Sequence, residues 1–485
     1  MRFFSTVFSV VGLGVLTCAS VLGGCGEPDP VDVDAGRADA EIERDSGPPP
    51  VDSGSGSDAG HDAGPSCTTG CSFVELALGS QFTCARRENG SVMCWGRGME
   101  GQLGDSNETH SPRCPIAMAD FRDCSARPVS VALEGPVTGL SAGAFSACAI
   151  DGMDDVQCWG QEGWPIDGVL AEVRYEPEAF PTLDDAALVS DGSILLCTVD
   201  NAGALECAGL NFARQTGTGM LISEVTLPAP VLVPGSLKSD PMPLTGVLEV
   251  RTGTSGAPFA CARTATDVYC WGSDSVGQLG TGLDYETCRN PSSFEMFDCT
   301  EYAHSLSGLD GSMVTQLALG GSHACALLSD GTVQCWGNNV ARQLGVDDVE
   351  ERATPLAVPG LTGVTQITAG SSHTCALLGS GEVRCWGYNR FGQLGDGLMS
   401  HGGASCTLST TNTGDCTPTA VAVSVIDDAT YIEAGSNHTC AIRASGAEVW
   451  CWGSNDMLQL GNGPTRTPTG EELAPVFEPV MVNGL

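Results

Sequence analysis

Residues 370–395 read GSSHTCALLGSGEVRCWGYNRFGQLG, and this stretch decides the fold. Cys375 and Cys385 flank a glycine-containing turn, a Cys-Trp-Gly tripeptide follows, and Gly-Gln-Leu-Gly closes the stretch. Comparison of the 485-residue chain with itself finds the same pattern seven times after residue 67. Recurrence of one unit is the signature of repeat architectures, in which each repeat is one supersecondary unit. We therefore expect one repeat domain from residue 67 to residue 485.

The copies differ most in the third repeat. The cysteine pairs at their centres are Cys84 with Cys94, Cys148 with Cys158, Cys197 with Cys207, Cys261 with Cys270, Cys325 with Cys335, Cys375 with Cys385 and Cys440 with Cys451. Six repeats carry Cys-Trp-Gly, with the tryptophans Trp95, Trp159, Trp271, Trp336, Trp386 and Trp452. The third has Cys207-Ala208-Gly209 instead. The third repeat is therefore the most divergent.

The segment between two paired cysteines predicts a β-hairpin. Residues 84–94 alternate in character around Glu88-Asn89-Gly90, which is a hairpin signal. If Gly90 adopts the left-handed conformation of a three-residue loop, counting outward places Cys84 directly opposite Cys94. Directly opposed residues in an antiparallel pair are within disulfide range. We therefore predict that each repeat closes its own hairpin with a disulfide.

The remaining cysteines are also expected to form pairs. Twenty-two cysteines follow Cys25, an even number, and those outside the hairpins pair as Cys67 with Cys71, Cys114 with Cys124, Cys288 with Cys299 and Cys406 with Cys416. A reducing cytosol does not keep so many disulfides, so the count indicates an oxidising compartment. Zinc sites need cysteines two to four residues apart or interleaved histidines, which the hairpin pairs lack.

The chain is strongly acidic, with a formal net charge of −38. Such a field repels phosphate backbones, so we expect no nucleic-acid partner. It favours cationic partners or divalent cations, and it equally serves solubility alone.

The N-terminus resembles that of a bacterial lipoprotein. Residues 3–22 form an apolar run that ends in Leu22-Gly23-Gly24-Cys25, which is similar to a lipobox. The resemblance implies removal of residues 1–24 as a signal peptide and acylation of Cys25. An ordinary signal peptide or an uncleaved anchor is the alternative. Residues 25–66 are rich in Asp, Gly, Pro and Ser, and residues 26–66 hold eight Asp and three Glu against two Arg, so this segment predicts a disordered acidic stalk.

The repeat resembles those of the regulator-of-chromosome-condensation family. The matching elements are Gly-x-x-His-x-Cys-Ala-Leu, a glycine turn, Val-x-Cys-Trp-Gly-x-Asn and Gly-Gln-Leu-Gly, and they recur from about residue 73 to the C-terminus. The resemblance implies an all-β fold, a seven-bladed β-propeller of four-stranded blades. The paired cysteines depart from the eukaryotic members. The last residues resemble the segment that precedes a repeat, so we expect the two ends of the domain to meet in the ring.

One repeat position holds either histidine or phenylalanine. His323, His373 and His438 occupy it in repeats five to seven, and Phe82, Phe145 and Phe259 are assigned to it in repeats one, two and four. Metal-ligating histidines do not normally interchange with phenylalanine. We therefore interpret this position as packing.

Three cysteine-closed insertions are the candidate binding loops. Each follows an intact Gly-Gln-Leu-Gly, in repeats one, four and six, so all three are expected on one face of the ring. Their candidate contact residues are Asp120, Phe121, Arg122, Asp123, Phe294, Met296, Phe297, Asp298, Asn412 and Asp415. Asp123, Asp298 and Asp415 precede the second cysteine and are expected to accept backbone N–H bonds, with Ca²⁺ binding as the open alternative. Otherwise no cofactor is expected.

The sequence favours a binding module over an enzyme. The sequence contains no Gly-x-Ser-x-Gly nucleophile elbow, His-Glu-x-x-His metalloprotease motif, phosphate-binding loop or dinucleotide fingerprint in a context that would support its function. A propeller holds variable loops on a rigid frame, so we predict a monomeric envelope lipoprotein, in the outer membrane or at the cell surface, that binds an extracellular protein or ligand. It touches the membrane only through its lipid. The alternatives are an inhibitor of a secreted enzyme and a hydrolase that uses the central channel.

Overall fold

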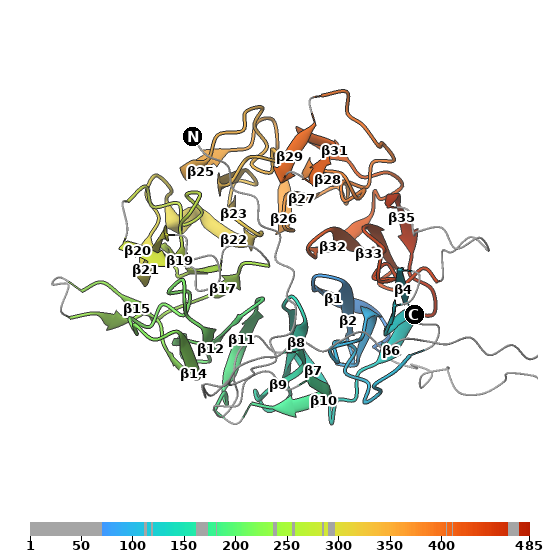
Figure 1. Ribbon diagram of the computed structural model, residues 1–485, viewed down its shortest axis with the longest axis horizontal. Coiled ribbons are helices and arrows are strands. Elements are labelled where there is room, and N and C mark those ends of the chain that lie inside the picture. The colour runs from blue at the N-terminus through green and yellow to red at the C-terminus, as the bar shows by residue number, and fades with distance from the viewer. Residues whose placement is uncertain are drawn as a thin grey trace, which may run out of the picture. The chain divides into compact units, whose positions relative to one another are not determined.

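Seven antiparallel sheets form the domain in this computed structural model. It describes residues 70–485, except 111–113, 118–119, 162–172, 181, 236–239, 255–257, 284–285, 290–295, 404, 410 and 464–474; side chains are also not described at 114–117, 120–122 and 286. The predicted signal peptide, Cys25, the predicted stalk and Cys67 therefore lie outside the described residues. The sheets are arranged as the blades of a ring around a common centre (Figure 1). The all-β seven-bladed propeller is thereby confirmed.

Each blade has four strands that pair in chain order. Blade 1 comprises β1 (Phe73–Leu78), β2 (Phe82–Arg87), β3 (Val92–Arg97) and β6 (Cys124–Ser130). Blade 2 comprises β7 (Val137–Ala142), β8 (Ser146–Asp151), β9 (Val156–Gln161) and β10 (Val173–Ala179). Blade 3 comprises β11 (Ala186–Asp191), β12 (Leu195–Asp200), β13 (Leu205–Leu210) and β14 (Glu224–Pro230). Blade 4 comprises β17 (Glu249–Thr252), β18 (Phe259–Arg263), β19 (Val268–Ser273) and β21 (Met296–Ser305), with β20 (Glu286–Arg289) as a fifth strand.

The last three blades follow the same order. Blade 5 comprises β22 (Val314–Leu319), β23 (His323–Leu328), β24 (Val333–Gly337) and β25 (Arg352–Ala357). Blade 6 comprises β26 (Val364–Ala369), β27 (His373–Leu378), β28 (Val383–Tyr388) and β31 (Cys416–Ala422). Blade 7 comprises β32 (Ala429–Ala434), β33 (His438–Arg443), β34 (Val449–Gly453) and β35 (Val476–Met481). Short two-stranded pairs are β4 (Cys114–Ala117) with β5 (Asp120–Arg122), β15 (Leu232–Val233) with β16 (Met242–Pro243), and β29 (Cys406–Ser409) with β30 (Asn412–Gly414); a 3-10 turn, η1, covers Gly311–Met313.

The hairpin register agrees with the sequence prediction. Cys84 lies opposite Cys94, Gly90 has a φ of +80°, and the N–H of Arg87 donates to the carbonyl of Ser91. In every blade the second and third strands are hydrogen-bonded neighbours at the centre of the sheet.

All seven predicted hairpin disulfides are confirmed, with Cα–Cα distances from 4.0 to 4.2 Å. They join Cys84 to Cys94, Cys148 to Cys158, Cys197 to Cys207, Cys261 to Cys270, Cys325 to Cys335, Cys375 to Cys385 and Cys440 to Cys451. In each pair the two cysteines are direct partners in the strand register. One covalent bond therefore ties together the two middle strands of every blade.

Tryptophan joins each blade to the one before it, except at the third. The indole N–H of Trp386 in blade 6 donates to the carbonyl of Gln343 in blade 5 at 2.9 Å. The other five tryptophans make the equivalent bond, Trp95 to Gln459, Trp159 to Gln102, Trp271 to Gln215, Trp336 to Gln278 and Trp452 to Gln393. The repeat seen in the sequence thus spans two blades, because the segment that contains its glutamine packs on the tryptophan of the following blade.

The ring closes by packing between blades 7 and 1. Trp95 and Phe73 of blade 1 share one apolar core with Ile442, Val449 and Leu485. The N–H of Phe73 donates to the carbonyl of Gly446 at 2.7 Å. The expected meeting of the two ends is therefore confirmed, and it needs no strand shared between blades.

The histidine position is a packing position, with one correction. His323, His373 and His438 are fully buried, and each ring accepts or donates a hydrogen bond at 2.9 Å to a threonine of the next blade: Thr374, Thr439 and Thr83. Phe82 and Phe259 are equally buried at the same place. In blade 2, however, Ser146 pairs with Gly160 as Phe82 pairs with Gly96, so Phe145 precedes the position by one residue and its assignment was wrong.

Candidate functional site

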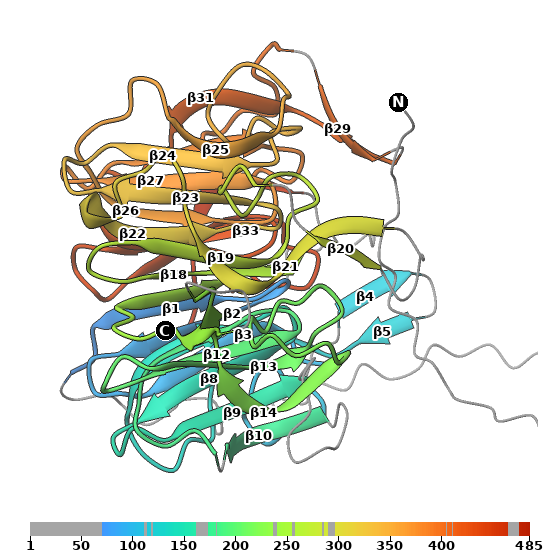
Figure 2. The ribbon, with the colours of Figure 1, turned by 90° about the vertical axis from the view of Figure 1, so that its left-hand side faces the viewer.

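The three insertions lie on one face of the ring. In every blade the connection from the third to the fourth strand leaves from the same face, which we call the loop face. The turn between the second and third strands lies on the opposite face, which we call the turn face. Figure 2 shows β4, β5, β20 and β29 extending beyond the blades on one side. Disulfides Cys288–Cys299 and Cys406–Cys416 close two of these loops.

The first insertion is described only in part. Cys71 and Cys124 are both disulfide-bonded. Their predicted partners are Cys67, outside the described residues, and Cys114, whose side chain is not described. Asp120, Phe121 and Arg122 form β5, but the structure gives only their backbone. Phe294 also lies outside the described residues.

Two histidines brace the bases of the first and third insertions. His401 donates its backbone N–H to Asp415 at 3.0 Å, and its ring nitrogens lie 2.5 Å from Asp415 and 2.7 Å from Asp396. His110 makes the same contacts in blade 1: its backbone N–H and Nδ1 contact Asp123, and Nε2 lies 2.9 Å from Asp105. Each histidine therefore ties the aspartate before the second cysteine to the aspartate that follows Gly-Gln-Leu-Gly. We call each set a histidine clamp.

The two aspartates of each clamp favour the charged form of its histidine. Burial opposes the charge on His110, but hydrogen bonds to Asp105 and Asp123 outweigh it and raise the pKa of His110 to about 9. The pKa of His401 is also raised, against the effect of burial, by its bonds to Asp415 and Asp396. A buried cation between two carboxylates is a strongly oriented arrangement, because each ring nitrogen has one partner. The clamps therefore fix where these two loops leave the ring.

The second insertion lacks this arrangement. Asp298 is exposed, and its backbone carbonyl accepts a hydrogen bond from the N–H of Asp274 at 2.7 Å. Asp123 and Asp415 accept backbone N–H bonds as predicted, whereas the capping role of Asp298 stays a prediction. Burial, with repulsion from Asp298, raises the pKa of Asp274 to about 6. Residues 290–295 of this insertion, and residues 284–285 before it, are not described.

The other candidate residues differ in exposure. Met296 is 61% exposed, whereas Phe297 is half-buried. Asn412 accepts hydrogen bonds from the Tyr388 hydroxyl at 2.7 Å and from Arg390 at 3.0 Å. Arg390 also donates to the carbonyl of Thr411. Tyr388 and Arg390 therefore hold the β29–β30 hairpin in place by hydrogen bonds. Met296 is thus the freest apolar side chain among the described candidates.

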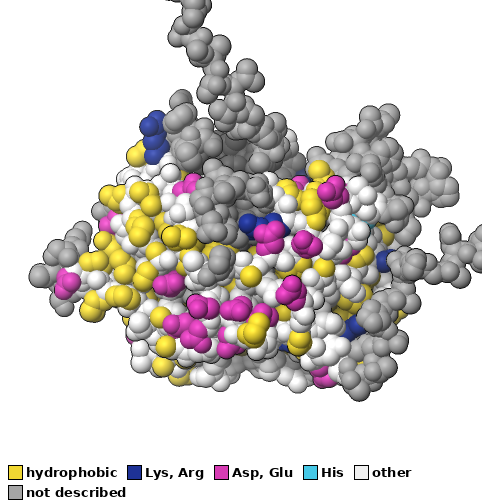
Figure 3. Space-filling view, turned by 90° about the horizontal axis from the view of Figure 1, so that it is seen from below, with side chains coloured by type: hydrophobic (Ala, Val, Ile, Leu, Met, Phe, Trp, Pro, Cys, Tyr) yellow, Lys and Arg dark blue, Asp and Glu magenta, His cyan; other side chains and the backbone are white. Residues whose placement is uncertain are grey.

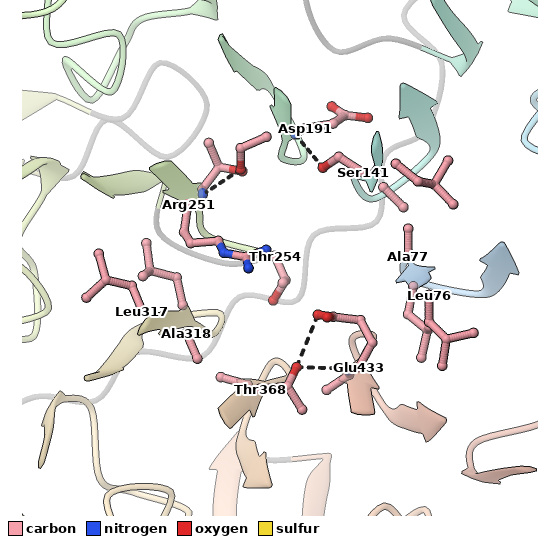
Figure 4. A pocket seen from close by; sticks show the side chains of 18 of the residues that line it. Leu76, Ala77, Ser141, Asp191, Arg251, Thr254, Leu317, Ala318, Thr368 and Glu433 are labelled. Carbon is pink, nitrogen blue, oxygen red and sulfur yellow. Dashed lines mark hydrogen bonds between the residues drawn. The ribbon is translucent and has the colours of Figure 1, made fainter. Parts of the chain in front are cut away.

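The central channel is narrow and its charged groups bridge blades. Its lining comes from the first strand of each blade and encloses about 110 Å³. Thr368 donates to Glu433 at 3.1 Å across blades 6 and 7, and Ser141 accepts the N–H of Asp191 across blades 2 and 3 (Figure 4). Arg251 lies 3.2 Å from Glu249, which also accepts the N–H of Leu317 in blade 5. These contacts give the lining a role in joining blades.

Two absences concern only the residues that the structure describes. Among them no group of His, Cys, Asp and Glu could hold a metal ion. In the same part of the chain no helix is both long and apolar enough to cross a membrane.

Known proteins share both the repeat and the fold. Two models of the regulator of chromosome condensation (RCC1) repeat match the chain, one at 73–102, 314–343, 364–393 and 429–459, the other at 267–327, 330–377 and 380–442. The human probable E3 ubiquitin-protein ligase HERC4 is 28% identical over 378 residues, which are 77% of this chain and 31% of HERC4. Human E3 ubiquitin-protein ligase HERC2 is 30% identical over 300 residues, which are 60% of this chain and 5% of HERC2. The chain thus spans a third or less of these relatives.

Solved structures agree on the fold. Human WBSCR16 superposes with a TM-score of 0.60 at 20% identity, covering 81% of this chain and 94% of that one. Prp20p of Saccharomyces cerevisiae, described with its binding to Gsp1p and histones, gives 0.58 at 17% identity, covering 77% and 84%. The folded domain of this chain is therefore a seven-bladed β-propeller of the regulator of chromosome condensation repeat type.

Proposed function

We propose that this protein is a non-catalytic recognition module of a bacterial cell envelope, anchored through Cys25, whose loop face binds an extracellular protein. The observation that carries the proposal is the set of three insertions on one face, two of them closed by a described disulfide and two braced by a histidine clamp. Ordering a loop before binding lowers the entropic cost of association. A solved propeller of the same fold, Prp20p, is described as binding proteins, which supports a protein partner.

The face of binding is testable in intact cells. A photo-crosslinking residue at Thr411, which is exposed on the β29–β30 hairpin, is expected to capture a partner. The matched control is Ser380, which is equally exposed on the turn between β27 and β28 and therefore lies on the turn face. A partner captured equally from both positions, or from Ser380 alone, would remove the loop face from the proposal. Absence of any crosslink from Thr411 in a folded protein would contradict binding by this face.

Anchoring rests on the Leu22-Gly23-Gly24-Cys25 boundary, which lies outside the described residues. Labelled palmitate is expected to enter the wild-type protein and not the Cys25→Ser variant, because the acylated thiol is absent from serine. The measurement is the label in the immunoprecipitated protein. Equal label in both proteins would exclude lipidation at Cys25, and an unlabelled but membrane-bound protein would indicate an uncleaved anchor.

A further inference from the structure

Three equivalent turns on the loop face expose apolar side chains. They have the pattern Gly-x-Gly-apolar, at residues 217–221 in blade 3, 280–283 in blade 4 and 395–399 in blade 6. Leu221 is 67% exposed, Leu283 52% and Met399 73%. Large apolar side chains are normally covered, and single exposed ones need no explanation. The residue directly after the second glycine is exposed in all three turns, Met220 to 42%, Leu283 to 52% and Leu398 to 51%, so this exposure is a repeated feature that needs an explanation.

The second glycine of each turn causes this exposure. Gly219, Gly282 and Gly397 have φ values of +69°, +64° and +81°, a region that side-chain-bearing residues rarely adopt. In blades 4 and 6 the chain therefore reverses between the buried leucine of Gln-Leu-Gly and the apolar residues that follow the turn. In blade 3 the buried residue at that position is Thr216. Leu279 and Leu394 are fully buried, whereas Leu283 and Met399, four and five residues later, point away from the blades.

These turns belong to the same face as the insertions, because they lie in the same connections. The N–H of Gly219 donates to the carbonyl of Glu301 at 3.1 Å, so the blade 3 turn lies against β21 of blade 4, the strand that also carries exposed Met296. In blade 5 the equivalent connection exposes Val349 to 56%. Blades 3 to 6 thus present an arc of exposed apolar side chains, which we call the apolar arc.

Acidic residues surround the apolar arc. The side chain of Glu478 lies against Gly397, and Val349 stands between Asp348 and Glu350. The side chains of Asp347 and Glu350 are 79% and 78% exposed, and each also forms an ion pair with an arginine of blade 5, Arg342 and Arg352 respectively. The whole chain carries one lysine and a formal net charge of −38. Figure 3 views the ring from the side of blades 2 and 3 and shows acidic side chains clustered there with few basic ones. A second copy of this chain or an anionic lipid surface would therefore be repelled.

We propose that the loop face docks a cationic, amphipathic polypeptide segment, with its apolar side chains on the apolar arc and its Lys and Arg side chains on the surrounding carboxylates. This rests on the proposed function and names its class of partner. Methionine and leucine on adaptable turns suit such a ligand, because the flexible thioether fills irregular contacts. Attraction between opposite charges adds speed of association and orientation.

The probe is a synthetic helix of about 20 residues with lysine on one face and leucine on the other. Its Kd for the folded domain is measured by calorimetry at physiological salt. The combined change Leu221→Ser, Leu283→Ser and Met399→Ser is expected to raise this Kd at least about tenfold. The matched control is Met153→Ser, because Met153 is 76% exposed in the turn between β8 and β9, on the turn face, and is expected to leave the Kd unchanged. Thermal unfolding checks that both variants stay folded.

An unchanged Kd for the triple variant would overturn the inference, and so would three other results with the variants and peptides. They are an equal loss with Met153→Ser, equal affinity for a peptide with serine in place of leucine, and equal affinity for one with glutamate in place of lysine. Self-association in sedimentation, or binding to phosphatidylserine vesicles, would assign the arc to another occupant. If Thr411 captures a partner in cells and the peptide does not compete, the proposed function stands and this inference fails. If Thr411 captures nothing, the proposed function itself fails.

Discussion

Between pH 7.5 and pH 5 the domain is expected to lose about 6 kcal/mol of its free energy of unfolding through three buried histidines. Burial lowers the pKa of His323, His373 and His438 to about 3. Repulsion from the neighbouring histidine adds to this effect at His323 and His373. In the unfolded chain a histidine has a pKa of about 6.5.

The sign follows from the lowered pKa. As the pH falls below about 6.5, the unfolded chain binds protons that the folded ring excludes, so the equilibrium shifts toward unfolding. At pH 5 each histidine costs about 2 kcal/mol, and the loss continues until the pH reaches the folded pKa. The three histidines sit between blades 5 and 6, 6 and 7, and 7 and 1, so acid weakens three consecutive junctions.

The matched variant replaces all three histidines by phenylalanine, the residue that blades 1 and 4 already carry as Phe82 and Phe259. Denaturant unfolding at pH 7.5 and pH 5 is expected to show the wild type losing about 6 kcal/mol more than the variant. His110 and His401 are common to both proteins, so their opposite pH dependence cancels in the comparison. The same pH dependence in both proteins would show that these histidines do not titrate on unfolding as argued.

Trp386→Ala is expected to lower the free energy of unfolding by about 3–5 kcal/mol, the usual cost of emptying a large core site. Trp386 is fully buried in the core between blades 5 and 6, where it packs with Leu344 and Val358. Its indole N–H also donates to the carbonyl of Gln343 at 2.9 Å. The change therefore removes both the apolar contact and the polar bond of that junction.

Trp386→Phe separates the two contributions. Phenylalanine keeps most of the apolar contact and loses the indole hydrogen bond. The Gln343 carbonyl still accepts a hydrogen bond from the Thr374 hydroxyl at 2.9 Å, so a smaller loss of about 1 kcal/mol is expected. Both losses are measured by denaturant unfolding at neutral pH. If Trp386→Ala cost less than about 1 kcal/mol, the tryptophan would not be what joins these blades.

Local rules predicted the blades from the sequence. The position of Gly90 and the alternation around it were enough to place Cys84 opposite Cys94, because a three-residue loop allows one register. Phe145 lies one residue before the histidine position. It was assigned to that position because the repeats were matched by residue type and not by distance from the cysteine. Counting two residues back from the cysteine reaches Ser146 in blade 2, which donates to Asp191 of blade 3 at 2.7 Å.

The histidine clamps were not predicted, because their members are separated by irregular chain. His401 lies five residues after Asp396 and fourteen before Asp415, and no periodic pattern relates such positions. The signal was nevertheless present: blades 1 and 6 both read Gly-Gln-Leu-Gly-Asp with a histidine five residues after the aspartate. The apolar arc was missed for a different reason, since exposure there depends on the backbone of the second glycine.

The closure of the ring has a consequence for the gene. Blades 1 and 7 are each complete, and Phe73 and Leu485 lie in one shared core, so the last residue of the domain ends beside its first strand. Joining the two by a short linker and opening the chain in another inter-blade connection would change the order in which the blades are translated but none of their contacts. A circularly permuted reading frame is therefore expected to encode the same ring.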